Sequence, residues 1–402
     1  MPSPRIPRVV WLLGLVSLCM DLSSEMIHAL LPVFLVSTLG ASPVTLGIIE
    51  GVAEGTASIV KIFSGAISDW VGKRKPLVVL GYGLAAFSKP LFPLANSAGW
   101  VLVARFADRI GKGIRGAPRD ALVADVTPPE TRGAAFGLRQ ALDTTGALFG
   151  PLLAIGLMTV LADNVRAVFW VAALPAVAAV VALAVGVKEP EQHGDGKRRR
   201  ALPRWGELHT LGRPFWLVVI TGTLFTLARF SEAFLIVRAH DVGLSLTWTP
   251  LALAVMNITY VISAYPVGIL SDRIGRGALL MAGLVTLIAA DAVLMFAPGL
   301  NLVLVGTALW GLHLGITQGL LSALVADTAP ADRRGTAFGL FYFVTGLAAV
   351  VSSVMAGALW KWYGPATTFG AGAAFAGVAL VLGLWQNRRR RNTLGTPDSG
   401  TM

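Results

Sequence analysis

The fourth long apolar segment of the chain, at residues 100–125, carries ionisable side chains whose spacing brings them together. They are Arg105, Asp108, Arg109, Lys112, Arg115, Arg119 and Asp120. Spacings of three and four residues place them on one face of an α-helix, so this face cannot be turned toward lipid. Ionisable groups at membrane depth cost about 2.5–3.5 kcal/mol each on insertion scales, and they usually mark binding sites or proton pathways.

Partners for these charges lie in other apolar segments. The first segment has Asp21, Glu25 and His28 on one face, the second has Glu50 and Glu54, the fifth has Arg139 and Asp143, and the seventh has Arg229 and Glu232. A carboxylate that takes up a proton in one conformation and releases it in another needs burial and a movable basic partner. Two interpretations stay open: the charges bind a substrate and protons, or they form a fixed ion-pair network that orders the helices.

The composition is that of a polytopic membrane protein. Of 402 residues, 55% are hydrophobic and 14% are charged, and the mean hydropathy is +0.70. A membrane helix needs about 20 apolar residues, so twelve spans fit this content. These values exclude a soluble enzyme, a coiled coil and a disordered protein, while the strands of a β-barrel would alternate in polarity.

Several kinds of chemistry have no support in the sequence. The single cysteine, Cys19, excludes an internal disulfide bond, and no group of Cys and His has the spacing of a zinc site. No phosphate-binding loop of the Walker type is present, so direct ATP hydrolysis is not expected. We therefore expect no metal, no cofactor and no enzymatic activity.

The apolar segments predict twelve membrane-spanning helices in two groups of six. The first group lies at residues 9–39, 44–67, 76–95, 100–125, 134–158 and 166–187, and the second at 214–238, 248–270, 277–297, 301–326, 337–359 and 364–386. We predict an N-terminal six-helix bundle at 1–187, a cytoplasmic linker at 188–213, a C-terminal six-helix bundle at 214–387 and a cytoplasmic tail at 388–402. The basic, glycine-containing composition of residues 188–213 is typical of a solvated linker.

The distribution of basic residues predicts the orientation in the membrane. Lys and Arg gather in alternate connections, such as Lys73–Lys75, Lys197–Arg200 and Arg388–Arg391, whereas the remaining connections carry few, such as Arg166. By the positive-inside rule both termini face the cytoplasm, in a cell inner membrane. This sidedness explains the net charge of +11 without nucleic acid as a partner. The expected partners are the lipid bilayer, protons and a small-molecule substrate, and the expected state is a monomer.

Two sequence motifs occur once in each half of the chain. Leu122–Asp125 followed by Arg132–Leu138 recurs as Leu324–Asp327 followed by Arg334–Leu340, and Gly65–Asp69 recurs as Gly268–Asp272. Such a repeat predicts an all-α polytopic membrane fold of two pseudo-symmetric six-helix bundles. Transporters built from repeats bind their substrates between the halves, near the middle of the bilayer.

On these motifs the chain resembles the major facilitator superfamily over essentially its whole length. The family pattern G-x-x-x-D-R-x-G-R-R is met by Gly65 to Arg74, with Trp70 in place of the first Arg, and by Gly268 to Arg276. The resemblance implies that these acids and bases form contacts that hold the transporter in one access state. The gating residues would be Asp69, Lys73, Arg74, Asp272, Arg273 and Arg276. The alternative is that these charges only fix the topology.

The fifth apolar segment is similar to the antiporter signature of the family, G-x8-G-x3-G-P-x2-G. Gly137, Gly146, Gly150 and Pro151 match it, and Ala154 replaces the last glycine. Small residues at this spacing let two helices approach closely, and a proline removes a backbone hydrogen bond. The resemblance implies a gating role for these four residues against leak, in a proton-driven exporter. The alternative is ordinary close packing of two helices.

The family pattern R-F-L-Q-G-x-G is met in part by Arg105, Phe106 and Gly111, with Asp108 and Arg109 in place of Gln and Gly. This resemblance implies that Arg105 modulates the protonation of a nearby acid. We assign Asp108 to the same proton-coupling group as Arg105. Because the first helix lines the cavity in this family, Asp21 and Glu25 are the expected proton carriers. The expected substrate-binding residues are His28, Glu50, Glu54, Arg109, Lys112, Arg139, Asp143, Arg229 and Glu232.

Together these features predict a proton-coupled antiporter that exports a small polar or anionic organic compound, or a drug, by alternating access. One alternative is a proton symporter for uptake of an organic anion on the same fold. Another is a membrane receptor or scaffold that binds a ligand without transporting it.

Overall fold

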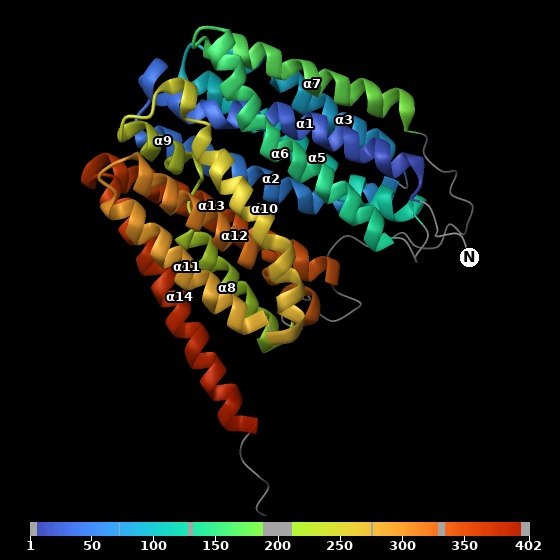
Figure 1. The fold of residues 1–402 in the computed structure, drawn as a ribbon. Helices are drawn as coiled ribbons and strands as arrows, with labels where there is room; N and C mark the ends of the chain where they lie inside the picture. The colour runs from blue at the N-terminus through green and yellow to red at the C-terminus, as the bar shows by residue number, and fades with distance from the viewer. Residues whose placement is uncertain are drawn as a thin grey trace, which may run out of the picture.

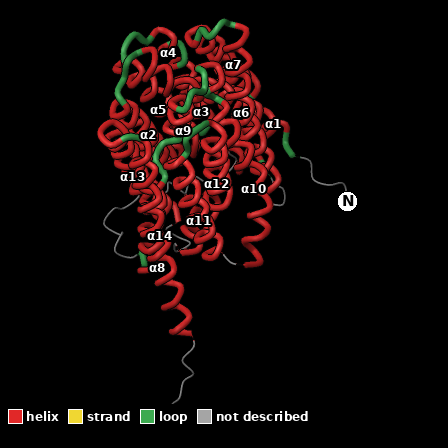
Figure 2. Tube along the Cα trace, turned by 60° about the vertical axis from the view of Figure 1, so that its left-hand side comes forward, coloured by secondary structure: helices red, strands yellow, loops and turns green. Residues whose placement is uncertain are grey.

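The computed structural model describes residues 6–71, 73–127, 132–187, 211–274, 276–328 and 334–394. Within these ranges the chain is helical apart from short connections, and it has no β-strand (Figures 1 and 2). The predicted linker 188–213 lies outside the described residues except for its last three positions. Its role and the predicted domain boundaries therefore stay predictions.

The N-terminal half contains the first six membrane-crossing segments. They are α1 (Arg8–Val33) continued by η1 (Phe34–Thr38), α2 (Pro43–Val71), α3 (Lys75–Ser88) with α4 (Leu91–Leu94), α5 (Ala98–Val126), α6 (Arg132–Val160) and α7 (Val165–Gly186). Their bounds differ by only a few residues from those predicted from the sequence.

The C-terminal half contains the other six segments. They are α8 (Arg213–Ala228) with α9 (Ala233–Asp241), η4 (Leu246–Trp248) with α10 (Leu251–Ile274), α11 (Arg276–Phe296), α12 (Leu300–Thr328), α13 (Arg334–Tyr363) and α14 (Pro365–Leu394). Of the twelve segments, 10 are long and apolar enough to cross a membrane on length and composition alone. The other two are α2 and α5, which carry the charged side chains that the sequence analysis singled out.

Corresponding helices of the two halves pack in the same way. In the N-terminal half α1 packs on α6 and α7, and α5 packs on α2 and α3. In the C-terminal half α8 packs on α13 and α14, and α12 packs on α10 and α11. Figure 1 shows the two groups, blue to green and yellow-green to red, lying side by side. The predicted fold of two pseudo-symmetric six-helix bundles is therefore confirmed.

Two of the predicted spans are interrupted inside the molecule. The third is broken at Lys89 and Pro90, between α3 and α4. The seventh is broken from Arg229 to Glu232, between α8 and α9, where the hydroxyl oxygen of Ser231 accepts a hydrogen bond from the backbone N–H of Ala233. Interrupted helices free backbone groups inside a membrane, and in transporters they commonly border binding sites.

The two halves meet along α2 and α13, which touch through backbone atoms. A Cβ atom on Gly51 of α2 would lie 2.9 Å from the carbonyl oxygen of Val350, and one on Gly346 of α13 would lie 2.9 Å from Cβ of Ser58. Gly47 and Gly55 of α2 extend this contact along the helix. Since these glycines follow one another every four residues, they form one face of α2, which we call the α2 glycine face.

At one end of the molecule the halves share an apolar core. Phe34 and Leu35 from the N-terminal half belong to the same buried cluster as Phe234 and Leu235 from the C-terminal half. A hydrogen bond of 3.1 Å between Ser37 and His240 joins the halves at this end. At the opposite end, which carries Lys73, Arg74 and Arg213 and which we call the basic end, each half has a separate apolar cluster. The halves are thus packed together at the end away from the basic end.

Candidate functional site

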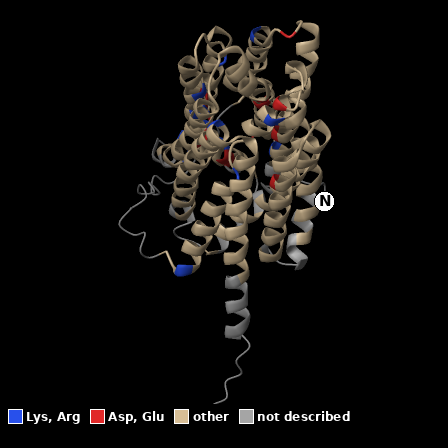
Figure 3. Cartoon of the chain, turned by 90° about the vertical axis from the view of Figure 1, so that its left-hand side faces the viewer, with Lys and Arg blue, Asp and Glu red and all other residues tan. Residues whose placement is uncertain are grey.

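Charged residues of the N-terminal half occur along its helices near the middle of the molecule (Figure 3), and their ion pairs join different helices. They come from the facing sides of α1, α2, α5 and α6, and most of them pair with one another. The charged face of α5 is therefore turned away from the lipid, as its spacing predicted.

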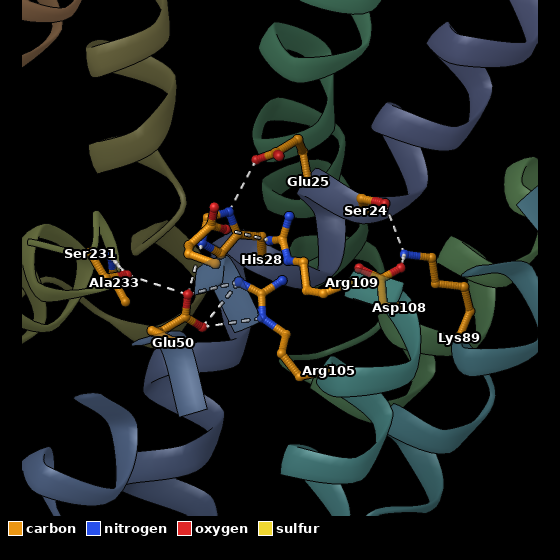
Figure 4. Close-up of polar contacts among 11 residues, drawn as sticks. Ser24, Glu25, His28, Glu50, Lys89, Arg105, Asp108, Arg109, Ser231 and Ala233 are labelled. Carbon is orange, nitrogen blue, oxygen red and sulfur yellow. Dashed lines mark hydrogen bonds and ion pairs between the residues drawn. The ribbon is translucent and has the colours of Figure 1, made fainter. Parts of the chain in front are cut away.

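A buried ion pair joins α2 to α5. The guanidinium of Arg105 donates hydrogen bonds of 2.8 and 3.0 Å to the two carboxylate oxygens of Glu50, and these residues are only 2% and 1% exposed (Figure 4). Ser231, in the interruption between α8 and α9, donates a hydrogen bond of 3.3 Å to the same carboxylate. His28 Nε2 lies 3.8 Å from it. Glu50 thus connects the charged face of α5 to the C-terminal half.

A second pair, between Arg109 and Glu54, is open to solvent on one side. The guanidinium of Arg109 lies 3.3 Å from the carboxylate of Glu54, whose side chain is 47% exposed. Next to it Glu25 is 3.4 Å from Nδ1 of His28. Because an exposed carboxylate can leave its partner more easily than a buried one, this pair is better suited than Glu50 and Arg105 to exchange with a ligand.

Lys89 is a buried partner that the sequence analysis did not assign. It lies at the interruption between α3 and α4, is 1% exposed, and donates hydrogen bonds of 2.8 Å to Asp108 and to Ser24 of α1. Asp108 is therefore held by Lys89, whereas Arg105, which we grouped with it for proton coupling, is held by Glu50. The sequence feature that could have indicated this buried partner is a single Lys followed by a proline within an apolar segment.

Asp21 and Asp143 form a pair of carboxyl groups between α1 and α6. Their carboxyl groups are within electrostatic range of each other, and Arg115 lies 3.9 Å from Asp21. Arg119 and Arg139 lie 3.7 and 3.4 Å from Asp143. Two adjacent carboxylates repel each other when both are ionised, so one proton shared between them relieves the repulsion. This arrangement can bind a proton, and the three neighbouring arginines can stabilise its deprotonated state.

Lys112, Arg229 and Glu232 form no close ion pair with any described residue. Within the described part of the chain, none of these side chains makes a hydrogen bond or an ion pair within 4.0 Å. Lys112 is exposed although it lies at the middle of α5. Arg229 and Glu232 lie in the interruption of the seventh span, within electrostatic range of each other and of Glu54.

These groups face one another across the two halves. Glu232 also interacts electrostatically with Glu25 and His28, and Lys112 interacts with Glu25 and Glu54. We call this set the central charged cluster: Glu25, His28, Glu54, Arg109 and Lys112 from the N-terminal half, with Arg229 and Glu232 from the C-terminal half. It offers cations and carboxylates to one molecule placed between the halves.

Comparison with known proteins gives the family. The sequence model described as Major Facilitator Superfamily matches residues 13–255 and again residues 233–399. The chain belongs to the major facilitator superfamily. It is 33% identical over 385 residues to an uncharacterized MFS-type transporter of Methanocaldococcus jannaschii, covering 94% of each chain. It is 24% identical over 393 residues to the Escherichia coli inner membrane transport protein YajR, covering 94% of this chain and 83% of the relative.

Among solved structures, that of the nucleoside transporter NupG has the same fold, with a TM-score of 0.78 over 94% of this chain and 99% of the other. The sequence identity is 12%, so the likeness concerns the fold. As a member of the major facilitator superfamily, the chain is a multi-pass membrane transporter of the secondary type.

In this superfamily member the glycines of the antiporter signature pack against α1, inside the N-terminal half. A Cβ atom on Gly150 would lie 2.5 Å from Cβ of Glu25, and one on Gly146 would lie 2.6 Å from the carbonyl oxygen of Leu18. These glycines thus allow the close approach that places Asp21 and Glu25 next to α6. α6 is continuous through Pro151, and Gly137 lies in a part of α6 whose side chains are outside the described residues. The gating role of the four residues stays a prediction.

The other expected gating contacts are visible only in part. Arg74 forms an ion pair of 2.5 Å with Asp125 at the end of α5, and Lys73 is exposed. The side chains of Asp69, Asp272, Arg273 and Arg276 lie outside the described residues. The function of this loop in gating therefore stays a prediction.

Replacing Gly150 with leucine should destabilise the protein by about 1–3 kcal/mol, because the new side chain would overlap Glu25 and the backbone of α1. Gly156→Leu on the same helix is the matched control, since a Cβ there meets nothing within 4 Å. Thermal unfolding in detergent, followed by loss of the monodisperse chromatographic peak, compares the two variants. Equal stability of both would show that the α1 contact is looser than described.

Proposed function

We propose that this protein is a proton-coupled antiporter that exports a small polar or anionic organic compound across the cell inner membrane by alternating access. The observation that carries the proposal is the central charged cluster, which presents unpaired charges from both halves to the space between them. An isolated charge at membrane depth is costly, so a substrate that pairs with Lys112 and Arg229 would draw the two halves together. Such a substrate favours the closed intermediate of the transport cycle.

The packing of the halves supports alternating access. They share an apolar core at the end away from the basic end and have separate cores at the basic end. If the basic end faces the cytoplasm, as the positive-inside rule predicts, this is the inward-facing arrangement. Substrate for export would enter the cluster from that side.

Antiport follows when the substrate and the proton compete for the same carboxylates. A substrate hydroxyl or amino group that donates to Glu25, Glu54 or Glu232 takes the place of a proton. Asp21 and Asp143 provide a second proton site behind the cluster, bordered by Arg115. A compound with an anionic group for the unpaired cations and a donor for the carboxylates therefore satisfies the cluster best.

The unpaired cations also support a second candidate, a proton symporter for an organic anion. An anion bound to Lys112 and Arg229 would increase the negative charge near Glu54 and Glu232, and it would therefore favour proton uptake. The two candidates thus differ in the sign of the proton change on substrate binding.

Proton release on substrate binding tests the proposal. We would add organic anions, amino acids and other zwitterions, organic cations and metal ions to detergent-solubilised protein in weak buffer with a pH indicator. Release with a polar organic compound is the expected result, and it should be lost in Arg229→Gln and kept in Lys361→Gln, which changes an exposed residue at the end of α13. Proton uptake with an anion would instead establish the symporter.

A further inference from the structure

A deeply buried carboxyl group among the described residues of the C-terminal half lies outside the central charged cluster. Asp291 of α11 is 0% exposed. One of its oxygens accepts a hydrogen bond of 3.1 Å from the indole N–H of Trp310 on α12. The other oxygen, Oδ2, has no hydrogen-bond partner among the described residues. A buried polar atom without a partner is uncommon in a folded protein and points to a missing proton or ligand.

The surroundings of this carboxyl group provide no cation. Trp310 is the side chain that α12 presents to it, and the imidazole of His313, one turn further on, is directed to the carbonyl of Gly283 at 2.8 Å. From α14 come Gly372 and Phe369, and from the region after α8 comes Phe230, whose ring packs on both Trp310 and Phe369. Within the described part of the chain no Lys, Arg or His lies within 4.0 Å of Asp291.

The unpartnered oxygen lies beside the end of α8. A Cβ atom built on Gly372 would lie 2.6 Å from Asp291 Oδ2 and 3.1 Å from the carbonyl oxygen of Ala228, so both oxygens border the same point. Ala228 is the last residue of α8, and none of the described N–H groups donates to its carbonyl oxygen. Two acceptors without a described donor therefore lie close to the same point, and a proton on the carboxyl group would supply the missing donor.

We propose that Asp291 is an exchangeable proton-binding site, and that in its protonated form the carboxyl group donates to the backbone carbonyl of Ala228 at the end of α8. An ionised carboxylate buried among aromatic rings with no cation would be strongly unfavourable, whereas the neutral acid satisfies both oxygens. The residue that follows Ala228 is Arg229. Protonation of Asp291 thus stabilises the end of the helix that positions an unpaired cation of the central charged cluster.

This site is independent of the direction of transport and of the substrate. It concerns a proton in the C-terminal half, whereas Asp21, Glu25 and Asp143 all lie in the N-terminal half. Loss of its proton would leave a carboxylate facing carbonyl oxygens, and the resulting repulsion favours a different arrangement of the segment from Ala228 to Glu232.

Infrared difference spectroscopy of the purified protein tests the site without a substrate. At neutral pH the Asp291→Asn variant should lack one C=O stretching band of a protonated carboxylic acid, a band that shifts when the parent protein is transferred to D2O. Asp398→Asn, near the C-terminus of the chain, is the matched control and should leave this band unchanged. Raising the pH should bleach the band reversibly while the protein remains folded.

A second variant keeps the test decisive if Asp291→Asn does not fold. Trp310→Phe removes the donor and keeps the carboxyl group, so it should shift the position of the same band without abolishing it. The proposal is overturned if Asp291→Asn and Trp310→Phe affect only bands of ionised carboxylates. It is also overturned if the acid band persists until the protein unfolds at high pH, because Asp291 would then be a permanently neutral structural acid.

Discussion

Replacing Arg105 with leucine should destabilise the protein by about 3–5 kcal/mol, because Glu50 would remain buried without the guanidinium that pairs with it. The guanidinium supplies two short hydrogen bonds to this carboxylate, and the contacts that remain are a hydrogen bond of 3.3 Å from Ser231 and the ring of His28 at 3.8 Å. Chemical unfolding in detergent or in bicelles, followed by circular dichroism, measures the effect.

Two further variants distinguish the destabilisation caused by a buried unpaired charge from that caused by the loss of one contact. The double variant Arg105→Leu, Glu50→Leu should regain much of the stability, since it removes both members of the buried pair. Arg74→Leu removes a partly exposed ion pair with Asp125 and should cost at most about 1 kcal/mol. If Arg105→Leu were as mild as Arg74→Leu, the charge of Glu50 would have to be compensated in another way.

Replacing Asp21 with asparagine should reduce proton-coupled exchange by at least about a hundredfold, because the amide cannot carry a proton between access states. Asp21 is suited to this role since its carboxyl group interacts with Asp143, and Arg115 lies within 3.9 Å. Transport into proteoliposomes, with the compound that gives proton release, measures the rate at a fixed pH gradient.

A matched control for this variant is Asp241→Asn, which changes an exposed aspartate at the end of α9. It should leave exchange unchanged. Substrate binding without a pH gradient should survive in Asp21→Asn, because the central charged cluster is intact. Full coupled transport by Asp21→Asn would remove Asp21 from the proton pathway and leave Glu25 as the remaining candidate of the first helix.

The positions of the helices could be predicted from the sequence, because the length and apolar character of each membrane span are properties of that segment alone. The first predicted segment, 9–39, matches α1 and η1 at Arg8–Thr38, and the fourth, 100–125, matches α5 at Ala98–Val126. The orientation of the α5 charges toward other helices also followed, since their spacing and the cost of lipid exposure allow no other arrangement.

The pairing of the charges could not be predicted in the same way. Partners such as Glu50 and Arg105, or Lys89 and Asp108, are brought together by the packing of different helices, and sequence spacing gives no information on it. The interruption after Ala228 was also missed, because the segment from Arg229 to Glu232 contains neither proline nor glycine. There Ser231 supplies the local hydrogen bond that competes with the helix.

The α2 glycine face has a mechanical consequence. Helices that touch through their backbones can roll over each other, but they cannot separate without losing all of these contacts together. The line of contact between α2 and α13 therefore acts as a pivot for the two halves. Glu50 and Glu54 stand on α2 itself, each next to a glycine of this face, Gly51 and Gly55. Because displacement grows with distance from the axis, a rotation about this line would move the backbone of α2 at these acids little and would move helices far from α2 and α13 much more.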